Sequence, residues 1–315
     1  MTYVVIIAYL AILLLIGVVA SRRIHNMADY YVGGKRLGYW VAAFSARASG
    51  ESAWLYLGLT GLGAMVGIRG MWVVVGECLG VGIAWFFMAT PFKRATDKFG
   101  SITIPDYLVS RFTTPGKSER PARVLRLASA IALSLFVTIY VSAQIDATGT
   151  AFENFLGWNY FAGAIFGFLI VVVYTMSGGF VAVAWSDLFQ GLLMLAGLLA
   201  LPVAACISMS DSPGVWGRLE SMQTGLTSLW GPGGPSLENV FIIVGYISIG
   251  LGFLGSPQVF VRLMSIRDEQ EIRKGRWVAI VFTLLTDTGA ILAGLLGRYP
   301  IAPDGDASRM FGSGA

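Results

Sequence analysis

The chain alternates between long apolar runs and short polar stretches, and eight of the runs are interpreted as helices that cross a membrane. A helical span of the hydrocarbon core needs roughly 20 mostly apolar residues. Basic residues follow the first run rather than precede it, which argues against a cleaved signal peptide. The pattern predicts an all-α integral membrane protein with spans at residues 2–20, 39–68, 71–90, 124–152, 160–175, 188–209, 240–261 and 277–296.

Two of the polar connections have a distinct character. Residues 99–123 include Ile104-Pro105-Asp106, which predicts a short amphipathic helix, because proline and acidic residues favour the first helical turn. Residues 210–238 include Trp-Gly-Pro-Gly-Gly-Pro from Trp230, which predicts an irregular loop. No soluble domain is expected.

The basic residues indicate an orientation. With the N-terminus outside, most of the 22 Lys and Arg residues lie in inside loops. Inside loops of membrane proteins carry an excess of Lys and Arg. The pattern therefore predicts an outside N-terminus and, after eight spans, an outside position for residue 315. The basic residues expected outside are Arg69, Arg218, Arg298 and Arg309.

Composition excludes several function classes. The chain is 56% hydrophobic and 13% charged, whereas soluble domains carry about 25% charged residues. Cys78 and Cys206 lie in apolar runs, which favours packing roles over a disulfide or a metal site. A single histidine, His25, leaves no histidine-rich metal site. The chain is basic, but its charges follow the membrane sides, so nucleic-acid binding is not expected.

The second span is interrupted by Ser45-Ala46-Arg47-Ala48-Ser49-Gly50-Glu51-Ser52-Ala53-Trp54. An ionisable residue within a span is costly and usually faces a cavity or a partner. Small residues permit unwinding, and unwound carbonyls at mid-membrane depth can bind a small cation. The alternative is that Arg47 and Glu51, four residues apart, pair with each other.

The seventh span shows a similar interruption, with Gly245, Gly250, Gly252 and Gly255 followed by Ser256-Pro257. This density of glycine indicates a second broken helix or, alternatively, close helix packing. Two broken helices separated by this distance are typical of an inverted-repeat transporter.

Other polar residues within the spans are open to two interpretations, as ligand contacts or as hydrogen-bonding residues inside the bundle. For Asp187, directly after Trp185-Ser186, capping of the sixth span is favoured, since Asp prefers helix N-termini. The residues open to both interpretations are Glu77, Gln144, Asp146 and Asp287.

At these residues the chain resembles the sodium:solute symporter family, and within it the sodium/proline symporters. The resemblance covers nearly the whole chain, and the order and spacing of its motifs make it specific. The motifs are Tyr-Tyr-Val-Gly-Gly-Lys-Arg-Leu-Gly from Tyr30, the stretch from Ser45 to Trp54, Ile-Pro-Asp-Tyr from Ile104, Thr-Ile-Tyr from Thr138, Gly-Gly-Phe-Val-Ala-Val-Ala-Trp-Ser-Asp from Gly178 and Gly-Leu-Gly-Phe-Leu-Gly-Ser-Pro-Gln from Gly250.

The resemblance implies a LeuT-like fold, a five-plus-five inverted repeat preceded by one extra helix. Residues 1–37 would form the extra helix and its loop, residues 38–210 the first repeat, and residues 211–315 the start of the second. It also implies a sodium site with backbone carbonyls of Ala48 and Glu51 as ligands. Its remaining hydroxyl ligands would lie beyond Ala315, so the chain is expected to be an incomplete member of the family.

The resemblance further implies a solute site, with proline as the first expectation. Trp54 and Tyr140 match the family pattern, whereas Ile249 and Phe253 replace a tryptophan and a tyrosine. The family's acidic residue is replaced by Gly50, with Glu51 at the next position. Asp187 would lie at the inside end of the ion path and assist release. The expected solute contacts are Ser49, Ser52, Trp54, Glu77, Tyr140, Gln144, Ile249 and Phe253.

The expected function is sodium-coupled import of a small organic solute across the plasma membrane, with Na⁺, the solute and the lipid bilayer as partners, no nucleic acid and no cofactor other than Na⁺ as coupling ion. One alternative is a membrane sensor domain of a histidine kinase. Another is a proton-coupled transporter that uses Glu51 or Glu77. A membrane enzyme is not expected, because no nucleophile with a positioned base is found. The solute and the oligomeric state stay open.

Overall fold

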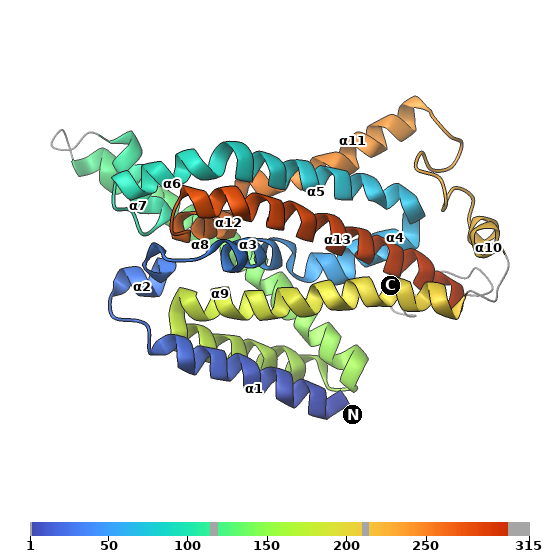
Figure 1. Cartoon of the computed structure of the whole chain (residues 1–315), viewed down its shortest axis with the longest axis horizontal. Helices are drawn as coiled ribbons and strands as arrows, with labels where there is room; N and C mark the ends of the chain where they lie inside the picture. The colour runs from blue at the N-terminus through green and yellow to red at the C-terminus, as the bar shows by residue number, and fades with distance from the viewer. Residues whose placement is uncertain (1, 114–118, 210–213, 302–315) are drawn as a thin grey trace. The chain divides into compact units, whose positions relative to one another are not determined.

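The computed structural model describes residues 2–113, 119–209 and 214–301, and this part of the chain is helical apart from turns and one isolated bridge (Figure 1). Short 3₁₀ or π segments connect several helices. The helices are α1 (Thr2–Ser21), α2 (Met27–Val32), α3 (Tyr39–Ala53), α4 (Thr60–Val66), α5 (Met71–Ile83), α6 (Ala89–Lys98), α7 (Ile104–Phe112), α8 (Glu119–Leu156), α9 (Tyr160–Ser208), α10 (Val215–Met222), α11 (Leu237–Leu251), α12 (Pro257–Ser265) and α13 (Glu269–Ile301).

Six helical stretches within the described residues are long and apolar enough to cross a membrane. Two of them, residues 39–98 and 160–208, each contain two of the expected spans. The second stretch is divided at Gly179, where φ is +51° and ψ is −150°. The expected helical segments are therefore found, but the count of eight crossings and the inverted repeat stay predictions.

The chain divides into two compact units that alternate along the sequence. Unit 1 comprises residues 1–50, 85–190 and 257–276, and unit 2 comprises residues 51–84, 191–256 and 277–315. Three of the long helices, α3, α9 and α13, pass from one unit to the other along their length. Each unit is described separately below.

In unit 1, α1 packs closely against α9. A methyl group added at Gly17 would lie 2.8 Å from the Cβ atom of Tyr174, and one added at Gly178 would lie 2.9 Å from the carbonyl oxygen of Gly17. Small residues permit this approach of two backbones, which drives helix association where apolar burial contributes little. The surrounding core includes Leu13, Ala20 and Val181.

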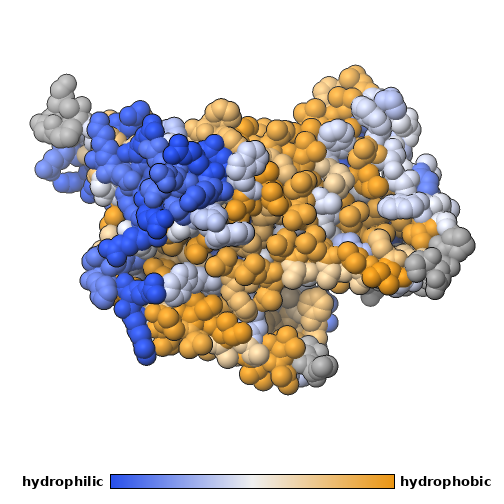
Figure 2. Space-filling model, viewed as in Figure 1, coloured by the Kyte–Doolittle hydropathy of each residue, from blue (hydrophilic) through white to orange (hydrophobic). Residues whose placement is uncertain are grey.

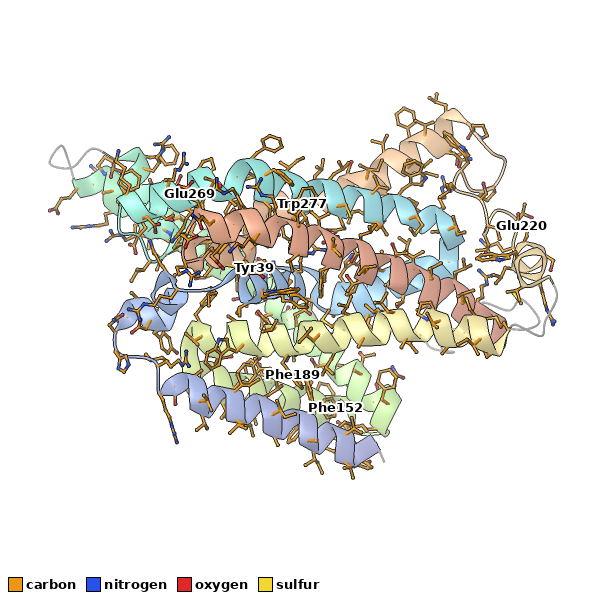
Figure 3. The ribbon with its side chains drawn as sticks, viewed as in Figure 1. Tyr39, Phe152, Phe189, Glu220, Glu269 and Trp277 are labelled. Carbon is orange, nitrogen blue, oxygen red and sulfur yellow. The ribbon has the colours of Figure 1, made fainter. Side chains whose placement is uncertain are left out.

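One end of unit 1 is held by main-chain contacts between distant segments. Leu37 and Ile266 form an isolated parallel bridge, in which the Leu37 amide donates to Ser265 at 3.1 Å. The Glu271 carboxylate accepts the Tyr39 amide at 2.7 Å and so caps the start of α3. Figure 3 labels Tyr39 on α3 and Glu269 at the start of α13.

The amphipathic helix predicted in the first polar connection is confirmed as α7. Its N-cap is Thr103, whose hydroxyl accepts the Asp106 amide at 3.2 Å, and Pro105 lies in the first turn. Hydrophilic residues gather around α6 and α7 in Figure 2, whereas hydrophobic residues cover much of the rest of the visible face.

In unit 2, α5 and α11 pack closely through three glycines, Gly76, Gly80 and Gly250. A methyl group added at Gly76 would lie 2.2 Å from the carbonyl oxygen of Ile247, and one added at Gly80 would lie 2.0 Å from that of Gly250. Both atoms belong to backbone, so neither can move aside without shifting a helix. The spacing of Gly76 and Gly80 is the small-xxx-small pattern of membrane helix pairs.

The connection between α9 and α11 is more ordered than predicted, because it contains helix α10. Two buried arginines hold this connection within unit 2. Arg298 donates to the Gln223 side chain at 2.8 Å. Arg69 donates at 2.8 Å to the side chain of Asn239, at the start of α11, and Asn239 in turn donates to the Pro232 carbonyl of the connection. The prediction of an irregular loop was wrong for residues 215–222, because Leu219 is buried and packs against a core cluster.

We expect Gly80→Ala to lower the thermal stability of the purified protein, because the added methyl group would push α5 away from α11. Overpacking of this kind costs about 1–3 kcal/mol. Gly82→Ala, in the same helix, is the matched control, since nothing lies within 4 Å of a methyl group there. Equal melting temperatures for the two variants would contradict the packing described.

We expect the turn after α10 to loosen at acidic pH. The Gly225 amide and the Thr227 hydroxyl and amide donate to Glu220, and these bonds lower the pKa of its carboxyl (Figure 3). The stabilisation is present above the unfolded pKa, about 4.3, and is lost as pH falls through the lower folded value. The protection factors of residues 223–228, which correct amide exchange for its intrinsic pH dependence, should fall with acid, and Glu220→Gln should remove that dependence.

Candidate functional site

The interruption predicted in the second span occurs at Ser52. This residue has φ +51° and ψ −141°, a conformation that costs non-glycine residues about 1–3 kcal/mol. A π-helical segment, Trp54–Leu59, follows directly. The helix is therefore unwound at one residue, while Ala48 and Ser49 lie before it within α3. Arg47 is fully buried, and Glu51 is 2% exposed.

The interruption predicted in the seventh span is also confirmed. Helix α11 ends at Leu251, a 3₁₀ segment covers Gly252–Gly255, and Ser256 is extended before α12 begins at Pro257. Proline is well suited to this position, because the backbone amide of the first helical residue has no partner within the helix and proline lacks that amide. Both interruptions therefore free backbone groups from regular helical hydrogen bonding.

A buried polar cluster lies in unit 1, built from α3, α9 and α12. We define the Asp187 cluster as Ser45, Ser49, Asp187 and Arg262. The Asp187 carboxylate oxygen Oδ2 accepts from the Ser45 hydroxyl at 2.6 Å, the Ser49 hydroxyl at 3.0 Å and the Arg262 guanidinium at 3.0 Å. Ser45 is fully buried, and Asp187 and Arg262 are each 8% exposed.

Both serine hydroxyls also accept hydrogen bonds from Arg262. Its Nε donates to Ser45 at 3.1 Å and its Nη2 to Ser49 at 2.6 Å. The guanidinium further donates to the Gln258 carbonyl at 3.0 Å and lies over the Phe180 ring at 5.4 Å. The cluster is therefore a closed network in which each serine hydroxyl bonds both to the Asp187 carboxylate and to the Arg262 guanidinium.

The preferred interpretation of Asp187 as a helix cap was wrong. Helix α9 passes through this position, because the helical segment resumes directly after Gly179 rather than at Asp187. Asp187 is thus an interior residue whose carboxylate is balanced by Arg262.

Helix α8 joins the cluster through Tyr140. Its hydroxyl donates to the Ser49 carbonyl at 2.8 Å. The structure therefore brings together three of the predicted site residues: Ser49, Tyr140 and Asp187. Gln144 lies one turn beyond Tyr140 on α8 and is partly buried. Asp146 instead accepts the Tyr160 hydroxyl at 2.6 Å, which favours a structural role for it.

The remaining predicted solute contacts belong to unit 2. Glu77 is 7% exposed and lies between Gly76 and Gly80 on α5. Phe253 is 7% exposed within the second break, whereas Trp54 and Ile249 are 38% and 40% exposed. Asp287 is fully buried in α13 and accepts the hydroxyl of Thr286 at 3.1 Å.

Sequence reasoning gave no role to Ser45 or Arg262. Arg262 counted only as one of the inside basic residues, although it follows the second break by a short distance. Ser45 and Ser49 are four residues apart on one face of α3, a spacing that could have paired them.

A model of the sodium:solute symporter family matches residues 30–307. The chain belongs to this family. It is an integral membrane protein, in agreement with the six apolar helical stretches found among the described residues.

Curated relatives include proline transporters. The chain is 36% identical over 292 residues to the high-affinity proline transporter PutP of Bacillus subtilis (strain 168), covering 90% of this chain and 58% of that protein. It is 33% identical over 298 residues to the sodium/proline symporter of Escherichia coli (strain K12), covering 92% and 56%. The chain therefore spans less than two thirds of the length of these relatives.

The fold is similar to that of a solved Na⁺-coupled sialic acid symporter in a substrate-bound outward-open state. The TM-score is 0.77, the similarity covers 96% of this chain and 61% of that chain, and the sequences are 21% identical. This likeness supports the fold alone.

We expect Tyr140→Phe to lower stability, because it removes the donor to the Ser49 carbonyl. A typical hydrogen bond contributes about 0.5–1.5 kcal/mol. Tyr107→Phe is the control, since the Tyr107 ring packs against Phe92 and Phe99. Thermal unfolding of the two purified variants should separate them, and an unchanged melting temperature for Tyr140→Phe would argue against the bond.

Proposed function

We propose that this protein takes part in sodium-coupled import of a small organic solute, most simply proline or a related amino acid. The observation that carries the proposal is the buried Asp187 cluster, which lies in unit 1 together with the part of α3 that leads into the break at Ser52. The break is also preceded directly by the buried carboxylate of Glu51, and an unwound helix beside such a charge is suited to handling a small cation. Membership of the family and the named relatives support the coupling ion and the solute class.

Sodium would be bound through backbone carbonyls of Ala48 and Glu51. A small hard cation prefers oxygen ligands, and interrupted membrane helices commonly supply them as backbone carbonyls. The Glu51 side chain is nearly fully buried, so its charge would also favour a cation.

The solute would be recognised by small hydroxyl residues of the first break together with aromatic and polar residues of three other helices. Ile249 and Phe253 keep the site apolar while changing its shape relative to the family pattern. The proposed contacts are Ser49, Ser52, Trp54, Glu77, Tyr140, Gln144, Ile249 and Phe253.

Asp187 would act after binding, on the path by which the ion leaves toward the inside. Coupling follows from linkage, since a ligand that stabilises the same conformation as a second ligand raises the affinity for it. The membrane potential adds about 2.3 kcal/mol per charge per 100 mV, which is enough to accumulate a neutral solute.

The proposal includes the architecture that the resemblance implies. The protein would lie in the plasma membrane with its N-terminus outside, and residues 38–210 would form the first of two inverted repeats after an extra helix at residues 1–37. Residues 211–315 would begin the second repeat.

The test is uptake of labelled proline into proteoliposomes that contain the complete product of the gene. Uptake should be stimulated by an inward sodium gradient and unaffected by a proton gradient alone. Sodium-stimulated uptake of a different amino acid would retain the symporter and replace the solute. Uptake driven by protons without sodium would overturn the coupling ion.

Glu51→Gln should weaken sodium dependence, because it removes a buried negative charge next to the proposed ligands. Asp146→Asn is the matched control, since that carboxylate binds Tyr160 and no role in transport is proposed for it. Sodium activation curves of uptake measure both. An unchanged half-saturating sodium concentration in Glu51→Gln would confine this residue to a backbone role.

A further inference from the structure

We infer that the Arg262 guanidinium is a tethered cation that competes with Na⁺ for a site formed by Asp187, Ser45 and Ser49. This inference rests on the proposed sodium coupling and adds a specific regulation to it. The site lies entirely within unit 1.

The oxygen atoms around Arg262 form a ligand set that suits a small monovalent cation. They are a carboxylate oxygen of Asp187 and the hydroxyl oxygens of Ser45 and Ser49, and each lies within 3.1 Å of a guanidinium nitrogen. Hard cations such as Na⁺ prefer carboxylate and hydroxyl oxygens to nitrogen or sulfur. The guanidinium thus occupies the place where a bare cation would find three oxygen ligands.

The hydroxyl groups can serve either occupant without rearrangement. Each donates its hydrogen to Asp187 and uses a lone pair to accept from Arg262. A hydroxyl that donates to a carboxylate keeps a lone pair for a cation. Replacement of the guanidinium by Na⁺ would therefore keep the Ser45 and Ser49 bonds to Asp187.

Charge makes the two occupants exclude each other. Asp187 and Arg262 are both about nine-tenths buried and form one neutral pair. A second positive charge at this depth would be uncompensated, and an unpaired buried charge is strongly destabilising. Na⁺ can therefore bind here only when Arg262 withdraws, and the return of Arg262 displaces Na⁺.

Arg262 has further contacts that hold its guanidinium in the site. The guanidinium lies over the Phe180 ring, and it donates to the Gln258 carbonyl within its own helix. For transport, this means that the Asp187 carboxylate stays neutralised by Arg262 when no Na⁺ is bound. Release of Na⁺ is assisted by the return of the guanidinium, which is part of the protein.

The test is equilibrium binding of radioactive sodium to the purified complete protein without solute. Arg262→Gln should raise the sodium affinity about tenfold or more, because it removes the competitor and leaves a buried carboxylate. Arg262→Lys, which retains the charge, should stay within about threefold of the wild type. Asp187→Asn combined with Arg262→Gln should abolish the gain, as expected for a coupled pair.

A second variant covers the case in which Arg262→Gln does not fold. Phe180→Leu keeps both charges but removes the ring under the guanidinium, so it should raise the sodium affinity by about threefold. Added guanidinium ion should restore the wild-type affinity of Arg262→Gln by filling the vacated site. Damage to the fold would lower the affinity, so the direction of the change separates it from competition.

The outcomes are distinguishable from failure of the proposed function. If the wild-type protein binds no sodium, the proposal of sodium-coupled import is itself overturned. Wild-type protein that binds sodium, with Arg262→Gln at the same or lower affinity and no response to guanidinium, would overturn the competition alone.

Discussion

The structure of this chain depends on one constraint: backbone N–H and C=O groups within the hydrocarbon of a membrane need hydrogen-bond partners. A regular helix supplies these partners itself, so a helix can be interrupted only where other groups of the protein or water take their place. Three interruptions lie within the long helices, at Ser52, at Gly179 and at residues 252–256. Two of them use glycine, whereas the first places a serine at positive φ. The strained residue is the one that directly follows Glu51, the buried acid of the proposed ion site.

The division of the chain into units coincides with two of these interruptions. Unit boundaries fall between residues 50 and 51 and between residues 256 and 257, next to the first and the last interruption. Two other boundaries, after residues 190 and 276, lie within the regular helices α9 and α13. The Asp187 cluster lies wholly within unit 1, so its network involves residues of one unit alone.

The sequence predicts the helical class, the apolar segments, both broken helices and α7, because each depends on local patterns of apolar, small and capping residues. It predicts Asp187 and Tyr140 as site residues through resemblance. It does not predict the role of Asp187 as a paired interior residue, because the continuity of α9 beyond Gly179 depends on packing. Arg262 and Ser45 stand 217 positions apart, and no local signal joins them. Helix α10 was missed because the glycines and prolines around it favour a loop.

The bridge between Leu37 and Ile266 is made of main-chain atoms. The Leu37 amide and carbonyl bind the Ser265 carbonyl and the Arg267 amide, so no side chain takes part in either hydrogen bond. Leu37 and Ile266 are themselves buried, so mutational drift here is limited to apolar side chains that fit the core. In evolutionary terms, a joint of this kind is inherited with the backbone path, and relatives with other apolar residues here can retain it.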